Sequence, residues 1–476
     1  MRIFERGPDD LNEFVKAITL LHQDKRLKMH YLIVNGNYVL WQARLQRFYL
    51  VDAKMDDYIR NTEEIDLDDN VIDPMVQEFE ALIPMFDAFE QMSLQQVEEG
   101  EIQLTINISH DCNMRCKYCF ASFGSYGRED HRGIMDIDTA RTIPVVFQNR
   151  RVSHVMFFGG EPLMNYQAID EICKGFAVSQ TPPPSYGLVT NGTIVTEQIL
   201  DILKKNSIPV TVSIDGHQLL HDELRPFISG QGTFDTVVKN IRVLQDFGIS
   251  VFFEATYTQQ HEQAGISPVE LVDGLKKKLG ISRGTLGFCE GDAEEGYAIP
   301  FDRRAKYSDE LTDYFLDQLM NDSEPYIDDD WLSLLSSLLN QSSRPHLCPV
   351  GEKAFALTPE GDVYPCHQLT VYEQLKLGGL QDFDLDESRN IAKQHLPLNY
   401  KSNFDKCSEC WLRYRCGGCV ASIRQNFGSF QDIPEAFCKG RFRNNFRLLG
   451  KLIEYQESSE RWQQFADGLS KVIELM

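Results

Sequence analysis

The sequence predicts an α/β protein built on a partial (β/α)6 barrel of the TIM type, with a winged-helix-like module before it and a cysteine-rich domain after it. The barrel is predicted by strand and helix patterns that alternate from Gln103 to about Met320. Six such units in series favour parallel strands joined by right-handed crossovers. The last domain is predicted by seven cysteines that crowd between Cys348 and Cys438, among turn-forming residues.

Length and composition limit the classes of protein that fit. A chain of 476 residues suggests two or three domains. The net charge of -24 argues against a nucleic-acid partner, which would need clustered Lys and Arg. No long apolar run and no signal-peptide pattern are present, so we expect a cytoplasmic protein without a membrane partner. In that compartment, twelve cysteines favour metal ligation over disulfides.

Residues 1–98 contain no cysteine and form the first predicted module. Its expected elements are a helix at Leu11–Leu21, strands at His30–Val34, Tyr38–Arg44 and Phe48–Val51, a turn at Asn35-Gly36 and a helix at Pro74–Gln91. Three small strands followed by helices resemble the leader-recognition modules of ribosomal peptide maturation enzymes. The resemblance implies a peptide taken up as an added strand on an exposed sheet edge. The alternative is an extension that only stabilises the fold.

Residues 99–321 form the predicted barrel. Strands are expected at 103–109, 153–158, 186–190, 208–214, 250–257 and 283–289, and helices at 137–149, 166–178, 195–205, 233–247, 268–278 and 302–320. Polar, Gly-containing segments follow the first four strands, namely Cys112–Cys119, Gly159–Pro162, Thr190–Thr193 and Ser213–Gly216. Because the carboxyl ends of parallel barrel strands meet on one rim, these segments predict a single site there.

The first of these segments carries cysteines at the spacing C-x3-C-x2-C: Cys112, Cys116 and Cys119. Three thiolates from one tight loop can hold three irons of a cubane cluster and leave the last iron open. An open iron suits a small molecule that offers both an amine and a carboxylate. The alternative is a structural zinc loop, with His110 as the extra ligand.

The cysteine spacing, with Tyr118 before the third cysteine, and the later Gly159-Gly160-Glu161-Pro162 together resemble the radical S-adenosylmethionine (SAM) enzymes. The resemblance implies that a 4Fe–4S cluster reduces SAM to a 5′-deoxyadenosyl radical, which then takes a hydrogen atom from a substrate. The residues it implies as SAM contacts are Gly159, Gly160 and Glu161 at the amino group, Tyr118 near the adenine, Ser213 at the ribose or carboxylate, Asn191 on the same rim, and Arg225 at the SAM carboxylate or the substrate. For Arg225 the alternative is a solvated loop arginine.

The C-terminal cysteines follow the pattern C-x12-G-x4-C, then C-x2-C-x5-C-x2-C, then one more cysteine. Over residues 346–440 this resembles the SPASM domain, the auxiliary-cluster extension of radical SAM peptide modifiers. The resemblance implies one auxiliary cluster on Cys407, Cys410, Cys416 and Cys438, another on Cys348, Cys366 and Cys419, and three 4Fe–4S clusters in all. Only Gly417-Gly418 separates the last pair, where the family usually has three residues, and a zinc ribbon is the alternative.

The set of Cys348, Cys366 and Cys419 offers three of the four protein ligands that a fully coordinated 4Fe–4S cluster takes. Cys289, at the end of the sixth predicted strand, is one candidate to complete it, although a lone strand cysteine is more often part of the core. Otherwise the cluster has an open iron able to bind a substrate thiolate, which a metal deprotonates.

The segment from Cys348 to His367 resembles the thioether-forming maturases of ribosomal peptides, in the ranthipeptide or freyrasin-type branch that joins Cys to Asp or Glu. The resemblance implies an oxidoreductase-type radical SAM enzyme. Its partners would be a precursor peptide with a leader sequence and a reductant such as flavodoxin or ferredoxin. The alternatives are oxidation of a Cys or Ser to formylglycine as in sulfatase maturation, carbon–carbon crosslinking, and a non-enzymatic iron–sulfur electron carrier.

Four remaining features have structural interpretations. Glu254 and Asp292 lie near strand ends but do not identify a general base, and Cys173 fits a helix core. Residues 322–345, with Asp328–Asp330, are expected to be a linker that is solvated or caps a helix. Residues 441–476 are expected to be a C-terminal helix, with the apolar stripe Phe442, Phe446, Leu449, Leu452 and Ile453 packed on the barrel or the cysteine-rich domain.

Overall fold

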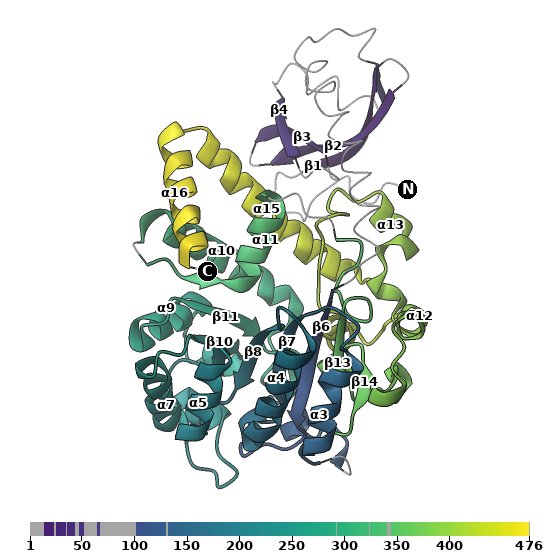
Figure 1. The fold of residues 1–476 in the computed structure, drawn as a ribbon. Helices are drawn as coiled ribbons and strands as arrows, with labels where there is room; N and C mark the ends of the chain where they lie inside the picture. Colours follow the sequence, from purple (N-terminus) through teal and green to yellow (C-terminus); the bar gives the residue numbers. More distant parts are fainter. Residues whose placement is uncertain are drawn as a thin grey trace.

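A computed structural model describes residues 14–22, 25–34, 36–42, 47–51, 64–66, 101–129, 132–291, 293–322, 324–339 and 344–475 (Figure 1). Its centre is a sheet of parallel strands that follow one another in sequence: β6 (Ile102–Ser109), β7 (Val152–Gly159), β8 (Ser185–Thr190), β9 (Val210–Ser213), β10 (Val251–Tyr257) and β11 (Arg283–Phe288). Each pairs in parallel with the next. The predicted parallel α/β core is therefore confirmed.

Six of the helices that follow these strands match the predicted ranges closely, and two short ones, Gln218–Leu224 and Gln259–Gln263, were not predicted. They are α3 (Ile137–Val146), α4 (Tyr166–Ser179), α5 (Glu197–Lys205), α6 (Gln218–Leu224), α7 (Phe234–Asp246), α8 (Gln259–Gln263), α9 (Pro268–Leu279) and α10 (Phe301–Asn321). Local signals set their ends, because Asp136 and Thr196 accept hydrogen bonds from backbone N–H groups at the starts of α3 and α5. The α9 helix has a capping box from Ser267 and Glu270.

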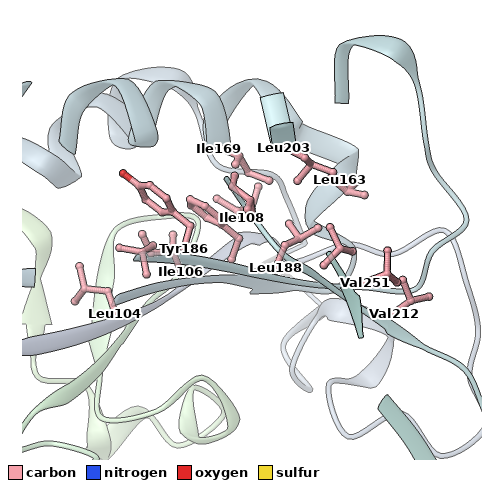
Figure 2. Packing of buried hydrophobic residues seen from close by; sticks show 14 of the residues in the cluster. Leu104, Ile106, Ile108, Leu163, Ile169, Tyr186, Leu188, Leu203, Val212 and Val251 are labelled. Atoms are coloured by element: carbon pink, nitrogen blue, oxygen red, sulfur yellow. The ribbon is translucent and has the colours of Figure 1, made fainter. Parts of the chain in front are cut away.

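The core lies between this sheet and the helices. Figure 2 shows Ile169 of α4 and Leu203 of α5 above strand side chains that include Ile108, Leu188 and Val212. All five side chains are buried. Strands that carry apolar side chains under helices are typical of parallel sheets, whose faces are covered by the crossover helices.

The cysteine-rich region extends the same sheet. Strand β13 (Ala354–Leu357) pairs in parallel with β6, so the sheet order is β12-β11-β10-β9-β8-β7-β6-β13-β14-β15. The further elements of this region are β14 (Asp362–Tyr364), β15 (Gly378–Gly379), α12 (Leu385–His395), α13 (Asp405–Ser408) and α14 (Val420–Phe427). A small apolar cluster that includes Leu347, Leu398 and Ile423 packs among these elements, so the region has a core of its own beside its cysteines.

The segment expected as a linker contains regular structure: β12 (Ile327–Asp328), parallel to β11, and α11 (Asp329–Leu339). Asp328 is buried and accepts hydrogen bonds from the backbone N–H groups of Asp330 and Trp331. Burial raises the pKa of its carboxyl to about 7. Asp328 thus caps the start of α11, and the solvated alternative is wrong for this residue.

The N-terminal module forms a five-stranded sheet in the order β4-β3-β2-β1-β5. The strands are β1 (Phe14–His22), β2 (Lys25–Val34), β3 (Asn37–Gln42), β4 (Arg47–Val51) and β5 (Glu64–Asp66). The prediction of a helix at Leu11–Leu21 is wrong for the residues that the structure describes. There, Phe14–His22 is a strand that pairs along its whole length with β2. Its apolar spacing fits a helix, but the β-branched Val15, Ile18 and Thr19 favour a paired strand. The helix predicted at Pro74–Gln91 lies outside the described residues.

This N-terminal sheet is docked on the cysteine-rich region and on α15 (Glu435–Gln456), at the top of Figure 1. Trp41 is completely buried, and its indole Nε1 donates to the carbonyl of Trp411 at 2.8 Å. The two rings meet edge to face, with centroids 5.9 Å apart. The side chains of β2 and β3 share an apolar cluster with Phe446 and Ile453 of α15.

The chain ends in two helices, α15 and α16 (Ser459–Leu475), where one was expected. The predicted apolar stripe is confirmed, but it faces two neighbours. Phe446, Leu449 and Ile453 pack towards Trp411 and the N-terminal sheet, and Leu452 packs in a cluster with α10.

Candidate functional site

The cysteine loop begins where β6 ends and is held by a segment distant in sequence. The N–H groups of Arg115 and Lys117 donate to the carbonyls of Pro226 and Leu224, both at 2.9 Å. At the start of the loop, the N–H of Cys112 donates to Asp111 Oδ1 at 2.8 Å. Two backbone hydrogen bonds therefore fix the loop to the segment Leu224–Pro226, and the Asp111 side chain fixes its start.

Cys112, Cys116 and Cys119 come together on this loop. Burial raises the pKa of the Cys112 thiol to about 12, with smaller contributions from Glu161 and the other two cysteines. Burial also raises the pKa of Cys116 to about 11, against the opposing effect of Arg225. A bound cation would offset these costs of ionisation, because metal coordination deprotonates a thiol.

The sulfurs are not arranged around a single ion. Within the described parts of the chain, no three His, Cys, Asp or Glu side chains are placed to hold one metal ion. The tetrahedral zinc geometry would bring sulfurs to about 3.8 Å from one another. Thiolates that bind separate irons of a cubane stand farther apart than this.

Paired glycines pack directly against the cysteine loop. The N–H of Gly160 donates to the carbonyl of Ser109 at 2.7 Å, and that of Glu161 to the carbonyl of Asp111 at 2.9 Å. A Cβ on Gly159 would stand 2.4 Å from the Ser109 oxygen, and one on Gly160 would stand 2.2 Å from the Asp111 oxygen. Only glycine allows this close approach of the second strand end to the first.

Glu161 is completely buried and links this turn to the end of β8. Its carboxylate accepts hydrogen bonds from the N–H of Leu163 at 2.9 Å, from Thr190 Oγ1 at 2.7 Å and from the N–H of Asn191 at 2.8 Å. Burial raises its pKa, and these three hydrogen bonds oppose that shift. Here the carboxylate positions Asn191 as well as placing negative charge near Cys112.

Asn191 in turn contacts the cysteine loop. Its Nδ2 donates to Asn113 Oδ1 at 2.8 Å and lies 3.7 Å from Cys112 Sγ. Asn113 completes the link by donating to Thr193 Oγ1 at 2.8 Å. The ends of β6, β7 and β8 are thus joined in one polar network, as their shared rim predicts.

Tyr118 and Arg225 meet at a buried carboxylate, Asp215. The Tyr118 hydroxyl donates to Asp215 Oδ2, and Arg225 Nη1 donates to the Tyr118 hydroxyl at 2.7 Å. Asp215 and Arg225 are only 0% and 8% exposed, so the solvated alternative for Arg225 is wrong. The sequence interpretation did not single out Asp215 as a functional residue, although the segment Ser213–Gly216 that follows β9 contains it.

Arg225 also carries a buried donor that could bind an anion. Its Nε is buried without a hydrogen-bond partner in the described structure, and its charge lowers the pKa of Cys116. A buried guanidinium N–H normally has an acceptor, and a carboxylate suits it well. This donor is the observation that best fits an amino acid, such as the methionyl part of SAM, beside the cysteine loop.

The remaining predicted rim residues lie farther along the same edge. Ser213 ends β9 and pairs in register with Glu254 of β10. Burial raises the pKa of Glu254, while the charge of Arg225 opposes that shift. Asp292 lies outside the described residues. Cys173 lies on α4 and is buried in the core, as predicted.

The first auxiliary set brings Cys348, Cys366 and Cys419 together. Burial, followed by the charges of Cys419 and Cys348, raises the pKa of Cys366. Burial also raises the pKa of Cys419 to about 11, with smaller contributions from Cys348 and from the neighbouring Glu290. The charged neighbours described for Cys289 are Arg304, Asp215, Glu290 and Glu295, and none of them is a cysteine.

The second auxiliary set is Cys407, Cys410, Cys416 and Cys438. Burial raises the pKa of Cys410, and the other three cysteines contribute to the same shift. Cys438 lies in the first turn of α15. The short Gly417-Gly418 link suits the packing, because a Cβ on Gly418 would stand 2.4 Å from the ring of Phe437.

Aromatic side chains connect the barrel rim with the first auxiliary set. His367 directly follows Cys366, and its ring centroid lies 4.4 Å from that of Phe158 and 6.1 Å from that of Phe120. Phe120 directly follows Cys119, and Phe158 lies near the end of β7. The two cysteine sets are therefore on opposite sides of one aromatic contact.

The parallel α/β core thus carries a cysteine site at the ends of its first strands. Residues 106–259 match the family model of the Radical SAM superfamily. The superfamily implies a 4Fe–4S cluster and SAM as cofactors. The three thiols, the glycine turn and the buried donor of Arg225 fit that pair.

Curated relatives align over much of the chain. The radical SAM cyclopropyl synthase TigE of Paramaledivibacter caminithermalis is 23% identical over 78% of this chain and 79% of its own. A serine-type anaerobic sulfatase-maturating enzyme of Bacteroides thetaiotaomicron is 24% identical over 76% of this chain and 92% of its own. The antilisterial bacteriocin subtilosin biosynthesis protein AlbA of Bacillus subtilis is 23% identical over 56% of this chain and 54% of its own.

Solved structures share the fold. The native anSMEcpe with bound AdoMet has a TM-score of 0.62 and 22% identity, covering 74% of this chain and 98% of that one. SuiB of Streptococcus suis bound to its precursor peptide SuiA has a TM-score of 0.53 and 16% identity, covering 88% of this chain and 100% of that one. Among the described residues, no helix is long and apolar enough to cross a membrane.

Proposed function

We propose that this protein is a radical SAM maturase that acts on a ribosomally made precursor peptide and joins a cysteine sulfur to a carbon as a thioether, with Asp or Glu as the acceptor residue. The observation that carries the proposal is the first auxiliary set of only three cysteines, which faces the radical SAM rim across Phe158 and His367. A metal site one protein ligand short is suited to bind a thiol brought by the substrate.

The cluster and SAM, when bound, supply the 5′-deoxyadenosyl radical. The protein's contribution is to hold and orient them. Cys112, Cys116 and Cys119 would bind the cluster, and the backbone of Gly159 and Gly160 would approach the SAM amino group. Arg225, held by Tyr118 and Asp215, would donate to the SAM carboxylate. The buried rim would exclude water from the reacting atoms.

The auxiliary sets would serve the second half of the reaction. Thioether formation removes two hydrogens: one leaves as an atom with 5′-deoxyadenosine, and the other leaves the thiol as a proton. One electron remains and must pass to an acceptor. We propose that the sets of Cys348, Cys366 and Cys419 and of Cys407, Cys410, Cys416 and Cys438 each hold a 4Fe–4S cluster that can receive it. A reductant such as flavodoxin or ferredoxin would supply the electron that starts the cycle.

The peptide substrate is supported by the relatives, two of which are named for sulfatase maturation and bacteriocin biosynthesis. We propose residues 1–98 as the module that recognises a leader sequence, residues 99–321 as the radical SAM barrel and residues 346–440 as the SPASM domain. Among the described strands of this sheet, β4 lies at an edge and offers backbone groups to which a peptide strand could add. The buried Trp41–Trp411 contact would keep that edge at a fixed distance from the clusters.

Co-expression with the peptide encoded beside the gene tests the proposal. We expect a mass loss of about 2 Da, two hydrogens, for each crosslink, with the cysteine thiol no longer open to alkylation. A Cys112→Ala/Cys116→Ala/Cys119→Ala variant should leave the peptide unmodified. A peptide that keeps its mass in the presence of active enzyme would contradict the proposal.

The same experiment separates the rival functions. Sulfatase-type maturation, which several relatives perform by name, would give a carbonyl-reactive product. Carbon–carbon bond formation, as the name cyclopropyl synthase implies for TigE, would leave the thiols free. Failure to produce 5′-deoxyadenosine from SAM after reduction would favour an electron carrier over any of these enzymes.

A further inference from the structure

We infer that the carboxylate of Glu290 is the fourth protein ligand of the cluster held by Cys348, Cys366 and Cys419. The inference rests on the proposed function in one respect, namely that this set holds a 4Fe–4S cluster. It replaces Cys289, which the sequence offers for the same position.

Glu290 lies beyond the end of β11, on the side where the barrel faces the cysteine-rich region. Ser422 connects its carboxylate with the cysteine set. The Ser422 hydroxyl donates to Glu290 Oε1, and the Ser422 N–H donates to Cys419 Sγ at 3.4 Å. One small residue thus contacts both the carboxylate and the thiol.

The carboxylate is held from behind by a buried arginine. Arg304 Nη1 donates to Glu290 Oε1 at 3.1 Å. The rest of the guanidinium is fixed by the carbonyl of Ile299 at 2.9 Å and by Asn426 Oδ1 at 3.0 Å. Both described contacts of the Glu290 carboxylate use Oε1. A ligating carboxylate is typically oriented in this way, with hydrogen bonds on one oxygen and the metal on the other.

Cys289 is placed differently. Its sulfur lies 3.8 Å from the backbone carbonyl of Glu290, and the charges that affect its pKa after burial are those of Arg304, Asp215 and two nearby glutamates. The described contacts therefore place the Glu290 carboxylate beside Ser422, and they place the Cys289 sulfur against the backbone of Glu290.

A carboxylate ligand would make the set complete at rest and still open to substrate. Carboxylate oxygen is a harder ligand than thiolate and binds iron of a sulfur cluster less tightly. A substrate thiol could therefore replace it: one iron–oxygen bond breaks, one iron–sulfur bond forms, and the thiol proton passes to water. No electrons are exchanged in this step.

Spectroscopy of the full-length reconstituted protein tests the inference without turnover. In a Cys112→Ala/Cys116→Ala/Cys119→Ala background, which removes the radical SAM cluster, 57Fe Mössbauer spectra and 13C-cyanide ENDOR report on the auxiliary irons. We expect Glu290→Gln to bind cyanide at least about tenfold more tightly than the parent, since the amide is a poor iron ligand. Glu290→Cys should give an all-thiolate spectrum and resist cyanide.

Glu295→Gln is the matched control, because it removes a nearby carboxylate that is not described beside Cys419. It should behave like the parent. Equal cyanide binding by the parent and Glu290→Gln would overturn the inference, and so would a spectral change in Cys289→Ser but not in Glu290→Gln. Iron content and thermal stability establish that each variant is folded and loaded, and Glu290→Cys provides an independent outcome if Glu290→Gln does not fold. A parent protein that holds no auxiliary iron would overturn the proposed three clusters together with the Glu290 ligand. A parent protein that holds the iron but shows no effect of Glu290→Gln would overturn the ligand alone.

Discussion

At the scale of residues, the site depends on positions where the backbone comes too close for a side chain. Gly159 has a φ of +140° and contacts Ser109, while Gly160 contacts Asp111 at the start of the cysteine loop. Glu161 then fixes Asn191 through a buried carboxylate. The glycines set the distance between the ends of β6 and β7. The Glu161 carboxylate fixes the end of β8 to them.

Gly160→Ala should disrupt this arrangement. The new Cβ would stand 2.2 Å from the Asp111 oxygen, so the turn or the cysteine loop must shift. We expect a loss of stability of about 1–3 kcal/mol, as for other overpacked sites. We also expect SAM to bind at least about tenfold more weakly, which is about 1.4 kcal/mol. Calorimetric titration of the reconstituted protein with SAM, with thermal unfolding alongside, measures both effects.

Gly287→Ala is the control for this substitution, because Gly287 lies in β11 with open space where its Cβ would be. It should bind SAM like the wild type. Unchanged SAM affinity in Gly160→Ala would show that the close approach does not shape the binding site.

At the scale of elements, long-range strand pairing decides two features that local patterns miss. Strand β13 joins the parallel sheet beside β6, so the cysteine-rich region begins inside the same sheet. Strand β1 pairs with β2 despite its helical apolar spacing. The N-terminal sheet then docks through Trp41 on the loop between Cys410 and Cys416. A leader peptide bound to that sheet would therefore sit on an element attached to the second auxiliary set.

Trp41→Ala should loosen this docking. Trp41 is 0% exposed, and removing a buried tryptophan costs about 3–5 kcal/mol. Trp41→Phe keeps most of the apolar contact and loses the hydrogen bond to Trp411, so its cost should be nearer 1 kcal/mol. Hydrogen exchange of the backbone amides in the Trp411–Leu412 segment and in α15 reports the effect. Their protection should be highest in the wild type, lower in Trp41→Phe and lowest in Trp41→Ala.

Leu50→Ala in β4 serves as the comparison, because Leu50 is 54% exposed. Its exchange pattern at the docking surface should match that of the wild type. Equal protection in Trp41→Ala and Leu50→Ala would mean that Trp41 does not hold the sheet in place.

At the scale of the whole molecule, the cysteines divide into three sets, one on the barrel rim and two in the C-terminal region. The first two sets are separated by the contact of Phe158 with His367, and the third lies under the N-terminal sheet. Burial lowers the pKa of His367 to about 4, so its ring is neutral at neutral pH. The aromatic contact between these two cysteine sets therefore carries no charge of its own at that pH.

Iron analysis tests the division into three sets. Three 4Fe–4S clusters predict about twelve irons per chain, whereas zinc in the C-terminal region would leave about four. Replacing two cysteines of one set by alanine should remove about four irons, whichever set is chosen. Cys173→Ala, in the core beside α4, should remove none. A wild-type value near four irons, with zinc present, would contradict the assignment of the auxiliary sets.

The sequence by itself determined the alternating core and the rim on which Cys112–Cys119 and Gly159–Glu161 meet. These features depend on local periodicity and on fixed spacing, which the chain carries without reference to its distant parts. The tertiary structure decided that Tyr118 and Arg225 share Asp215, that Glu290 and not Cys289 lies beside Cys419, and that Phe14–His22 is a strand. Each of these depends on which segments, far apart in sequence, lie side by side, and on which face a side chain is turned when they do.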